Sequence, residues 1–133
     1  MPHLTIEYSS NLEGRADLDR LCRATLGAIL SKPAFEIGAA RVRAVRCDHF
    51  AIADQLPENA FVHMAFRIGS GRTEAEKREA GDAIFAAARG TLAELFDTPH
   101  FALSLEVREL DPALSWKANA MHARLRGERE GSR

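Results

Sequence analysis

The sequence predicts a single α/β domain, an α+β two-layer sandwich in which a four-stranded sheet carries two helices on one face. Three observations predict it. The chain has 133 residues, a length that suits one domain with one core. Four segments alternate apolar and polar residues, and two segments repeat apolar residues at helical spacing. These segments follow one another as β-α-β and again as β-α-β, so the fold is expected to consist of tandem β-α-β units.

The first unit spans about residues 2–46. Residues 3–8 alternate, with Leu4, Ile6 and Tyr8 on one side, which is typical of a strand. Residues 15–32 place their apolar positions on one helical face, and Pro33 ends that helix. Residues 40–46 alternate again and are expected to form the second strand.

The second unit spans about residues 60–108, after a connector that covers roughly residues 47–59. Its strands are expected at residues 60–68 and 101–108. Thr73 and Glu76 have the spacing of a capping box, which predicts a helix from there to about Phe96. The two strands of each unit should be parallel and joined by a right-handed crossover.

Two helices can cover only one face of this sheet, so the other face is expected to pack against other copies of the protein. Residues 2–125 are assigned to the single domain. The segment 109–125 has little periodicity, and we expect it to reach across to a neighbouring copy. The polar residues 126–133 are expected to be a disordered tail.

Composition excludes several classes of function. The formal net charge is −1, with 46% hydrophobic and 28% charged residues, which argues against a nucleic-acid or membrane partner. No signal peptide and no bilayer-length apolar run is visible. Cys22 and Cys47 have neither metal-ligand spacing nor the number of a disulfide framework. A reduced, cytoplasmic protein is the expectation.

Pro2 is the residue with the clearest chemical potential. Removal of Met1 before a small second residue would leave a secondary amine at the terminus, directly before the first strand. Burial and nearby arginines disfavour the protonated form of an amine and lower its pKa. A base with a pKa near neutral pH is suited to general acid–base catalysis. A second-position proline can equally be no more than a stable terminus, so the motif alone is weak.

Four ordered segments strengthen the case. They are PHLTIEYSSN, RVRAVRCDHFAIAD, AFVHMAFRIGSGRT and LSLEVRELDPALSWKANAMH. Together they resemble the 5-carboxymethyl-2-hydroxymuconate isomerase family of the tautomerase superfamily, over about residues 2–125. The sequence departs from the family pattern at Trp116, where a smaller aromatic residue is expected, and at Gln55, where glycine is expected. The tail after Leu125 also looks longer than usual.

The resemblance implies a tautomerase-like fold and a homotrimer with three active sites at subunit boundaries. It implies that Pro2 is the general base and that Arg41 and Arg72 are the two functional arginines. The implied reaction is the ketonisation of 5-carboxymethyl-2-hydroxymuconate, a dienol carboxylate, in the breakdown of homoprotocatechuate. No metal and no organic cofactor is implied.

The chemistry of the residues agrees with these assignments. Arg41 and Arg43 are two apart on a strand, so both should lie on one face. Guanidinium groups bind carboxylates in a bidentate manner, so the expected partner is a small anionic dicarboxylate or tricarboxylate substrate. Arg72 follows a Gly-Ser-Gly bend at the start of a helix, where backbone N–H groups favour anions. Arg43 could bind substrate, although an interface or surface ion pair is favoured, and Arg72 could be simply solvated. Phe50 and Trp116 could form walls of the pocket.

Other polar residues are weaker candidates. A structural histidine is favoured for His63, in the middle of a strand. His3 could tune the site or lie at the strand edge. Two further functions stay open: another proline-based tautomerase acting on a related dienol or 2-oxo acid, and a non-catalytic module that binds a small ligand.

Overall fold

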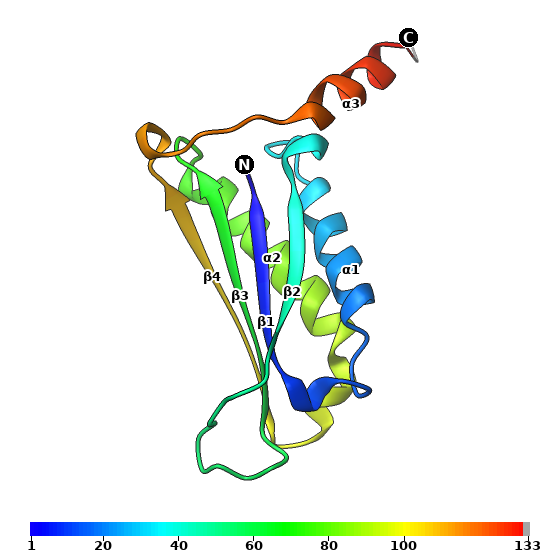
Figure 1. Ribbon diagram of the computed structural model, residues 1–133, viewed down its shortest axis with the longest axis vertical. Coiled ribbons are helices and arrows are strands. Elements are labelled where there is room, and N and C mark those ends of the chain that lie inside the picture. The colour runs from blue at the N-terminus through cyan, green and yellow to red at the C-terminus, as the bar shows by residue number, and fades with distance from the viewer. Residues whose placement is uncertain (132–133) are drawn as a thin grey trace.

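The computed structural model describes residues 1–131, and its four strands form one mixed sheet in the order β2-β1-β3-β4. The strands are β1 (His3–Ser9), β2 (Arg41–Cys47), β3 (Ala60–Gly69) and β4 (Phe101–Leu110). β1 pairs in parallel with β2, β3 pairs in parallel with β4, and β1 and β3 are antiparallel at the centre. This arrangement confirms the predicted tandem β-α-β units (Figure 1).

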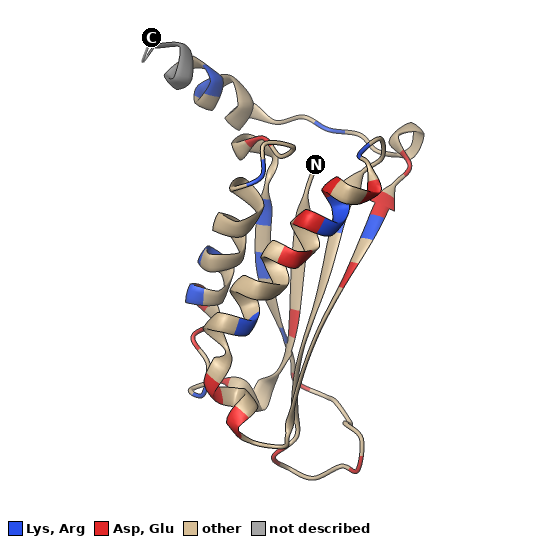
Figure 2. Cartoon of the chain, turned by 180° about the vertical axis from the view of Figure 1, so that it is seen from behind, with Lys and Arg blue, Asp and Glu red and all other residues tan. Residues whose placement is uncertain are grey.

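The two long helices cover the same face of the sheet, as predicted (Figures 1 and 2). α1 (Leu18–Leu30) begins after Asp17, whose carboxylate accepts from the Arg20 backbone N–H at 2.9 Å. α2 (Glu74–Thr91) begins at the predicted capping box, in which Thr73 and Glu76 bond to each other's backbone N–H. α2 ends earlier than expected, because the chain turns into a short 3-10 helix, η3 (Ala93–Asp97).

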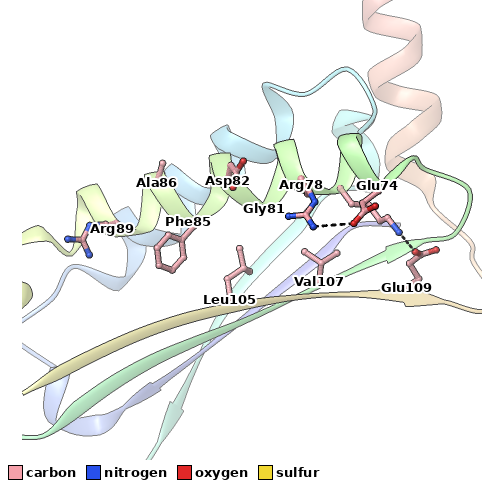
Figure 3. Close-up of a pocket in the computed structure, with 11 residues that line it drawn as sticks. Glu74, Arg78, Gly81, Asp82, Phe85, Ala86, Arg89, Leu105, Val107 and Glu109 are labelled. Carbon is pink, nitrogen blue, oxygen red and sulfur yellow. Dashed lines mark hydrogen bonds and ion pairs between the residues drawn. The ribbon is translucent and has the colours of Figure 1, made fainter.

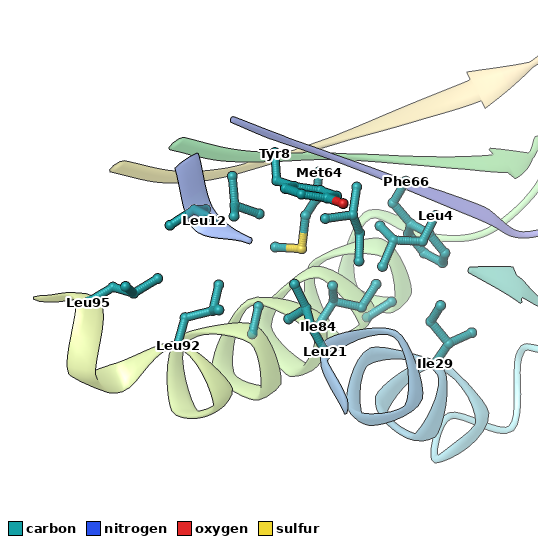
Figure 4. Close-up of a cluster of buried hydrophobic side chains, with 14 of the residues drawn as sticks. Leu4, Tyr8, Leu12, Leu21, Ile29, Met64, Phe66, Ile84, Leu92 and Leu95 are labelled. Atoms are coloured by element: carbon teal, nitrogen blue, oxygen red, sulfur yellow. The ribbon is translucent and has the colours of Figure 1, made fainter. Parts of the chain in front are cut away.

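The core lies between this helical layer and the sheet (Figure 4). The inward residues of the two central strands alternate along the chain and are fully or almost fully buried: Leu4, Ile6 and Tyr8 on β1, and Val62, Met64, Phe66 and Ile68 on β3. They pack against Leu21 and Ile29 of α1 and Ile84 of α2. This single core fixes the central strands, and with them the sheet end at which β1 begins.

The opposite sheet face has no helix over it. Its side chains are largely polar and bond to each other along the sheet. His63 lies in the middle of β3, with Nδ1 2.6 Å from Ser104 Oγ and Nε2 2.9 Å from Glu106 Oε1. Both ring nitrogens of His63 therefore have partners on the neighbouring strand, in keeping with the structural role favoured for it.

The C-terminal segment differs from the prediction. Residues from 126 were expected to be disordered, but α3 (Ala120–Gly131) continues through them, and residues 132–133 lie outside the described part. Its start is capped by Asn119, whose Oδ1 accepts from the Met121 N–H at 2.9 Å. Asn119 Nδ2 also donates to Gly38 O at 2.8 Å, and Arg126 forms a bidentate pair with Glu36. These contacts tie the segment to its own chain.

None of the helices within residues 1–131 is both long enough and apolar enough to cross a membrane.

Candidate active site

The amino terminus lies at one end of the sheet, beside the start of β2 and the end of β3 (Figure 1). Pro2 is buried, and its carbonyl accepts from the Arg41 backbone N–H at 3.0 Å. This bond continues the parallel ladder, in which His3 is paired with Arg41. The first peptide units are therefore held as rigidly as the sheet itself.

Arg41 lies directly beside this terminus. Its Nη1 donates to the Met1 sulfur at 2.6 Å and to Ala39 O at 3.3 Å. The short 3-10 helix η2 (Ile37–Ala39) turns the chain into β2 immediately before Arg41. Met1 therefore occupies a donor position of Arg41 that would be free in a chain starting at Pro2.

Arg72 approaches from the bend between β3 and α2. Gly71 makes the bend with a φ of 103°, a conformation that glycine adopts without steric cost. Arg72 Nη2 donates to Ala34 O at 3.0 Å and Nη1 to Gly69 O at 3.3 Å. The guanidinium also stacks on Phe35, with 4.4 Å between Cζ and the ring centroid. Its position is thus fixed from several sides.

These cations act on the terminal amine. The pKa of the Met1 amino group is lowered, first by burial, then by the charge and hydrogen bond of Lys117, and then by Arg72 and Arg41. Among the side chains of residues 1–127, none of these three cations forms an ion pair with a carboxylate, whereas Arg46, Lys77 and Arg126 each do. The sheet end is therefore a place where positive charge is available to an anion.

Arg43 lies away from this group, on the open sheet face. Its Nη1 is 3.2 Å from His3 Nδ1. Both line a cavity of about 310 Å³, together with Arg67 and Arg108. Burial and then the charges of Arg43 and Arg41 lower the pKa of His3, which favours the neutral imidazole. Arg43 thus faces a second cationic pocket, on the same strands as the terminus but on the helix-free face.

The two aromatic candidates are not part of the same cluster. Phe50 lies in the β2–β3 connector, which is at the far end of the sheet from the amino terminus (Figure 1), and its ring contacts Phe61. Trp116 is next to Lys117 in sequence, but its side chain is 85% exposed. Neither residue forms a wall of the site within one chain, so a role for Phe50 in the pocket requires a second copy.

A larger groove, of about 830 Å³, lies elsewhere, between α2 and the edge strand β4 (Figure 3). Leu105, Val107 and Phe85 line its apolar part. The charges at one end are paired, Lys77 with Glu109 at 2.5 Å and Arg78 with Glu74 at 3.2 Å. None of the predicted site residues lines it, and its surface resembles a packing surface more than a reaction site.

No group of three or more potential metal-ligating side chains occurs in the part of the chain that the structure describes. Four residues near these two sites were not predicted from the sequence: Lys117 and Phe35 at the amino terminus, and Arg67 and Arg108 on the open face. Strand pairing accounts for the positions of Arg67 and Arg108, because Arg67 is paired with His3 of β1 and with Arg108 of β4. These pairs could be predicted from the alternation of residues once the strand order was known. No sequence signal identified Lys117 or Phe35.

Comparisons with known proteins agree on one relationship. The sequence model of the 5-carboxymethyl-2-hydroxymuconate isomerase family matches residues 2–125. The 5-carboxymethyl-2-hydroxymuconate Delta-isomerase of Escherichia coli is 33% identical over 123 residues, which are 92% of this chain and 98% of that protein. The crystal structure of a 5-carboxymethyl-2-hydroxymuconate isomerase from Deinococcus radiodurans R1 is similar with a TM-score of 0.88 and 40% identity, over 93% of each chain. The fused 4-OT symmetric trimer shares the fold at a TM-score of 0.63, with 17% identity over 83% of this chain and 88% of that one.

Proposed function

This chain belongs to the 5-carboxymethyl-2-hydroxymuconate isomerase family of the tautomerase superfamily and is an isomerase, and we propose that it ketonises 5-carboxymethyl-2-hydroxymuconate with the amine of Pro2 as the base. The observation that carries the proposal is the group of three cations around the amino terminus, which form no ion pair with any carboxylate of residues 1–127. The setting we propose is the breakdown of homoprotocatechuate.

The reaction requires Met1 to be absent. With Met1 in place the Pro2 nitrogen is an amide, which has no basic lone pair. Removal of Met1 would make the Pro2 nitrogen a secondary amine. This amine would lie one residue further along the chain than the Met1 amine, a step of about 3.8 Å between consecutive Cα atoms. The amine would then lie among the same cations, Lys117, Arg72 and Arg41, that lower the pKa of the Met1 amine. We therefore expect a substantial neutral fraction of the Pro2 amine near neutral pH.

The substrate is an anion that suits this site. A muconate with a carboxymethyl group carries three carboxylates, and the sheet end offers Arg41 and Arg72 as bidentate donors. Arg72 is already held by Phe35 and two backbone carbonyls, so little rotamer entropy is lost when it binds a carboxylate. Arg41 gains a free Nη1 donor when the Met1 sulfur departs.

In the proposed reaction the neutral Pro2 amine takes the proton of the 2-hydroxyl group. The resulting dienolate has a developing negative charge on that oxygen, which an arginine stabilises. The protonated amine then gives the proton to a carbon further along the conjugated chain, and the enol becomes a ketone. No atom is gained or lost, and the amine returns to its neutral state for the next cycle.

We also propose that the chain acts as a homotrimer. The helix-free sheet face and the outer edge of β4 are both left open within one chain (Figures 1 and 3). Leu114 and Trp116, two residues apart in the segment after β4, are 71% and 85% exposed, and neighbouring exposed apolar side chains favour an interaction surface. Another copy would cover these surfaces and could bring its Phe50, or the Trp116 side chain, toward a neighbouring site. Arg43 then remains a candidate for substrate contact on the sheet face.

The test is the loss of the dienol ultraviolet absorbance on addition of protein whose intact mass shows that Met1 is absent. The expected result is rapid ketonisation by the natural sequence and a collapse of at least about 100-fold in Pro2→Ala, in line with the contribution of a general base. Alanine is also small, so Met1 is expected to leave this variant too. Equal rates in the two proteins would reject Pro2 as the base, and no acceleration by either would reject this substrate.

A further inference from the structure

The segment that joins β4 to α3, residues 111–119, crosses the sheet end at which the amino terminus lies (Figures 1 and 2). We call it the strap. At its start the strap continues directly from β4, and Asp111 Oδ1 accepts from the Ala113 N–H at 3.0 Å within the strap. At its end Asn119 Nδ2 donates to Gly38 O at 2.8 Å. The strap is therefore held over the site by its own chain.

Lys117 is the only basic residue of the strap. Ser115 lines the open-face cavity with His3 and Arg43, and Asn119 contacts Gly38 just before β2, so Lys117 lies between two points that adjoin the amino terminus. Of the three cations there, Lys117 has the largest effect in lowering the pKa of the terminal amine. Among the side chains of residues 1–127, no carboxylate forms an ion pair with Lys117. A lysine placed near another amine, with no acidic partner among those side chains, gains nothing for stability from that neighbour. This arrangement is suited to receiving an anion from outside.

We propose that Lys117 is a third cation of the active site, which binds a carboxylate of the substrate beside the Pro2 amine. The inference rests on the proposed function and deepens it. Arg41 and Arg72 offer two guanidinium groups, whereas the proposed substrate has three carboxylates. Lys117 supplies the third positive charge, and the strap thereby selects tricarboxylates over dicarboxylates of the same dienol type.

The side-chain type fits the role. Lysine carries a compact charge on a flexible stem, and Lys117 is exposed, so its ammonium can follow a ligand. Two neighbouring ammonium groups repel each other, because the repulsion between like charges is only partly screened near a protein surface. Lys117 therefore has a second effect, which is to keep the neighbouring amine neutral until the substrate's negative charge arrives.

The experiment compares Lys117→Met, which removes the charge at similar length, with Lys117→Arg, which keeps it. Lys32→Met is the matched control, because Lys32 lies just after α1 and takes no part in the site. Each protein is checked for loss of Met1 by mass. For Lys117→Met we expect KM for the tricarboxylate to rise about tenfold with a smaller change in kcat. We expect Lys117→Arg to recover most of the loss and Lys32→Met to behave as the natural sequence.

A second measurement does not depend on turnover. In protein labelled with nitrogen-15 proline, the terminal Pro2 amine is the only proline nitrogen that titrates, and its pKa should be higher in Lys117→Met than in the natural sequence. Unchanged KM and unchanged amine pKa in Lys117→Met would overturn the proposal, and so would a Lys117→Arg variant as impaired as Lys117→Met. Should the natural sequence fail to ketonise the substrate, the proposed function fails, while the titration still decides whether Lys117 acts on the amine.

Discussion

Replacement of Gly38 by alanine tests how the strap is held over the site. A Cβ at this position would lie 2.8 Å from His122 Nδ1 and 3.4 Å from His122 Cα, so α3 must move away. The movement strains the 2.8 Å bond from Asn119 to Gly38 O. It also separates His122 from Glu36, whose Oε2 lies 3.2 Å from Nδ1 but outside hydrogen-bonding alignment.

The size of the effect follows from these contacts. A neutral hydrogen bond contributes about 1 kcal/mol net, and a partly exposed ion pair contributes up to about 1 kcal/mol. Loss of about 1–2 kcal/mol raises the population of the undocked strap about 5- to 30-fold. The midpoint of thermal unfolding should hardly change, because no residue of α3 belongs to the buried core.

Hydrogen exchange of the backbone amides measures this directly. In Gly38→Ala we expect amides of residues 120–127 to exchange faster by that factor, while β1 and β3 amides keep their natural rates. Gly27→Ala is the control, because a Cβ there meets nothing within 4 Å and should only stabilise α1, by about 0.5–1 kcal/mol. Natural exchange rates in α3 of Gly38→Ala, or equal acceleration in the core strands, would refute the docking account.

Three further predictions address the site and the assembly. Arg72→Lys loses the bidentate guanidinium group and its stacking on Phe35, so kcat/KM should fall about 10- to 100-fold in a steady-state assay. The control Arg78→Lys should keep the natural kcat/KM, because Arg78 pairs with Glu74 on α2. An undiminished kcat/KM in Arg72→Lys would exclude Arg72 from substrate binding. The unprotonated Pro2 amine is the proposed base, so kcat/KM should rise with pH through a pKa below the ordinary 8.0 of a terminal amine. Arg41→Met removes a positive charge beside the amine and should move this rise to higher pH. An unchanged pH profile in Arg41→Met would show that Arg41 does not affect the pKa of the amine. Sedimentation should give three times the 14.6 kDa chain mass, and emission of the single tryptophan, Trp116, should shift to longer wavelength on dilution; a monomer at all concentrations would contradict the trimer.

The terminal amine of the chain that retains Met1 affects stability in a defined direction. The lowered pKa of the Met1 amine means that the folded chain binds fewer protons than the unfolded chain below the ordinary pKa of 8.0. The free energy of unfolding should therefore fall as the pH drops from about 8 through the lowered pKa.

Most of the fold could be predicted because each element had a local signal. Alternation in residues 3–8 and 60–68 marked the central strands, and the Thr73–Glu76 pair marked the start of α2 to the residue. The C-terminal end was harder. Residues 120–131 have a weak apolar pattern, and α3 depends on tertiary contacts such as Asn119 with Gly38 and Arg126 with Glu36, which are more than 80 residues apart in sequence.

The candidate site, like the fold, could be predicted only in part from the sequence. Arg41 and Arg72 could be placed at the amino terminus because the resemblance pointed to them, and the strand order then brings them there. Phe50 had no such support, since a single chain leaves it at the other end of the sheet. Lys117 could not be found from spacing, because its position depends on the path of an irregular segment across the sheet end. Long-range contacts of loops are the information that periodicity does not carry.

The most direct test of the central claim uses one preparation in two states. The chain is made with Met1 retained, its mass is confirmed, and dienol ketonisation is measured before and after treatment with a methionine aminopeptidase. We predict negligible ketonisation while Met1 covers Pro2 and contacts Arg41, followed by full activity once the mass falls by one methionine. Equal activity in the two states would exclude Pro2 as the base, because a proline nitrogen inside a peptide bond cannot act as a base.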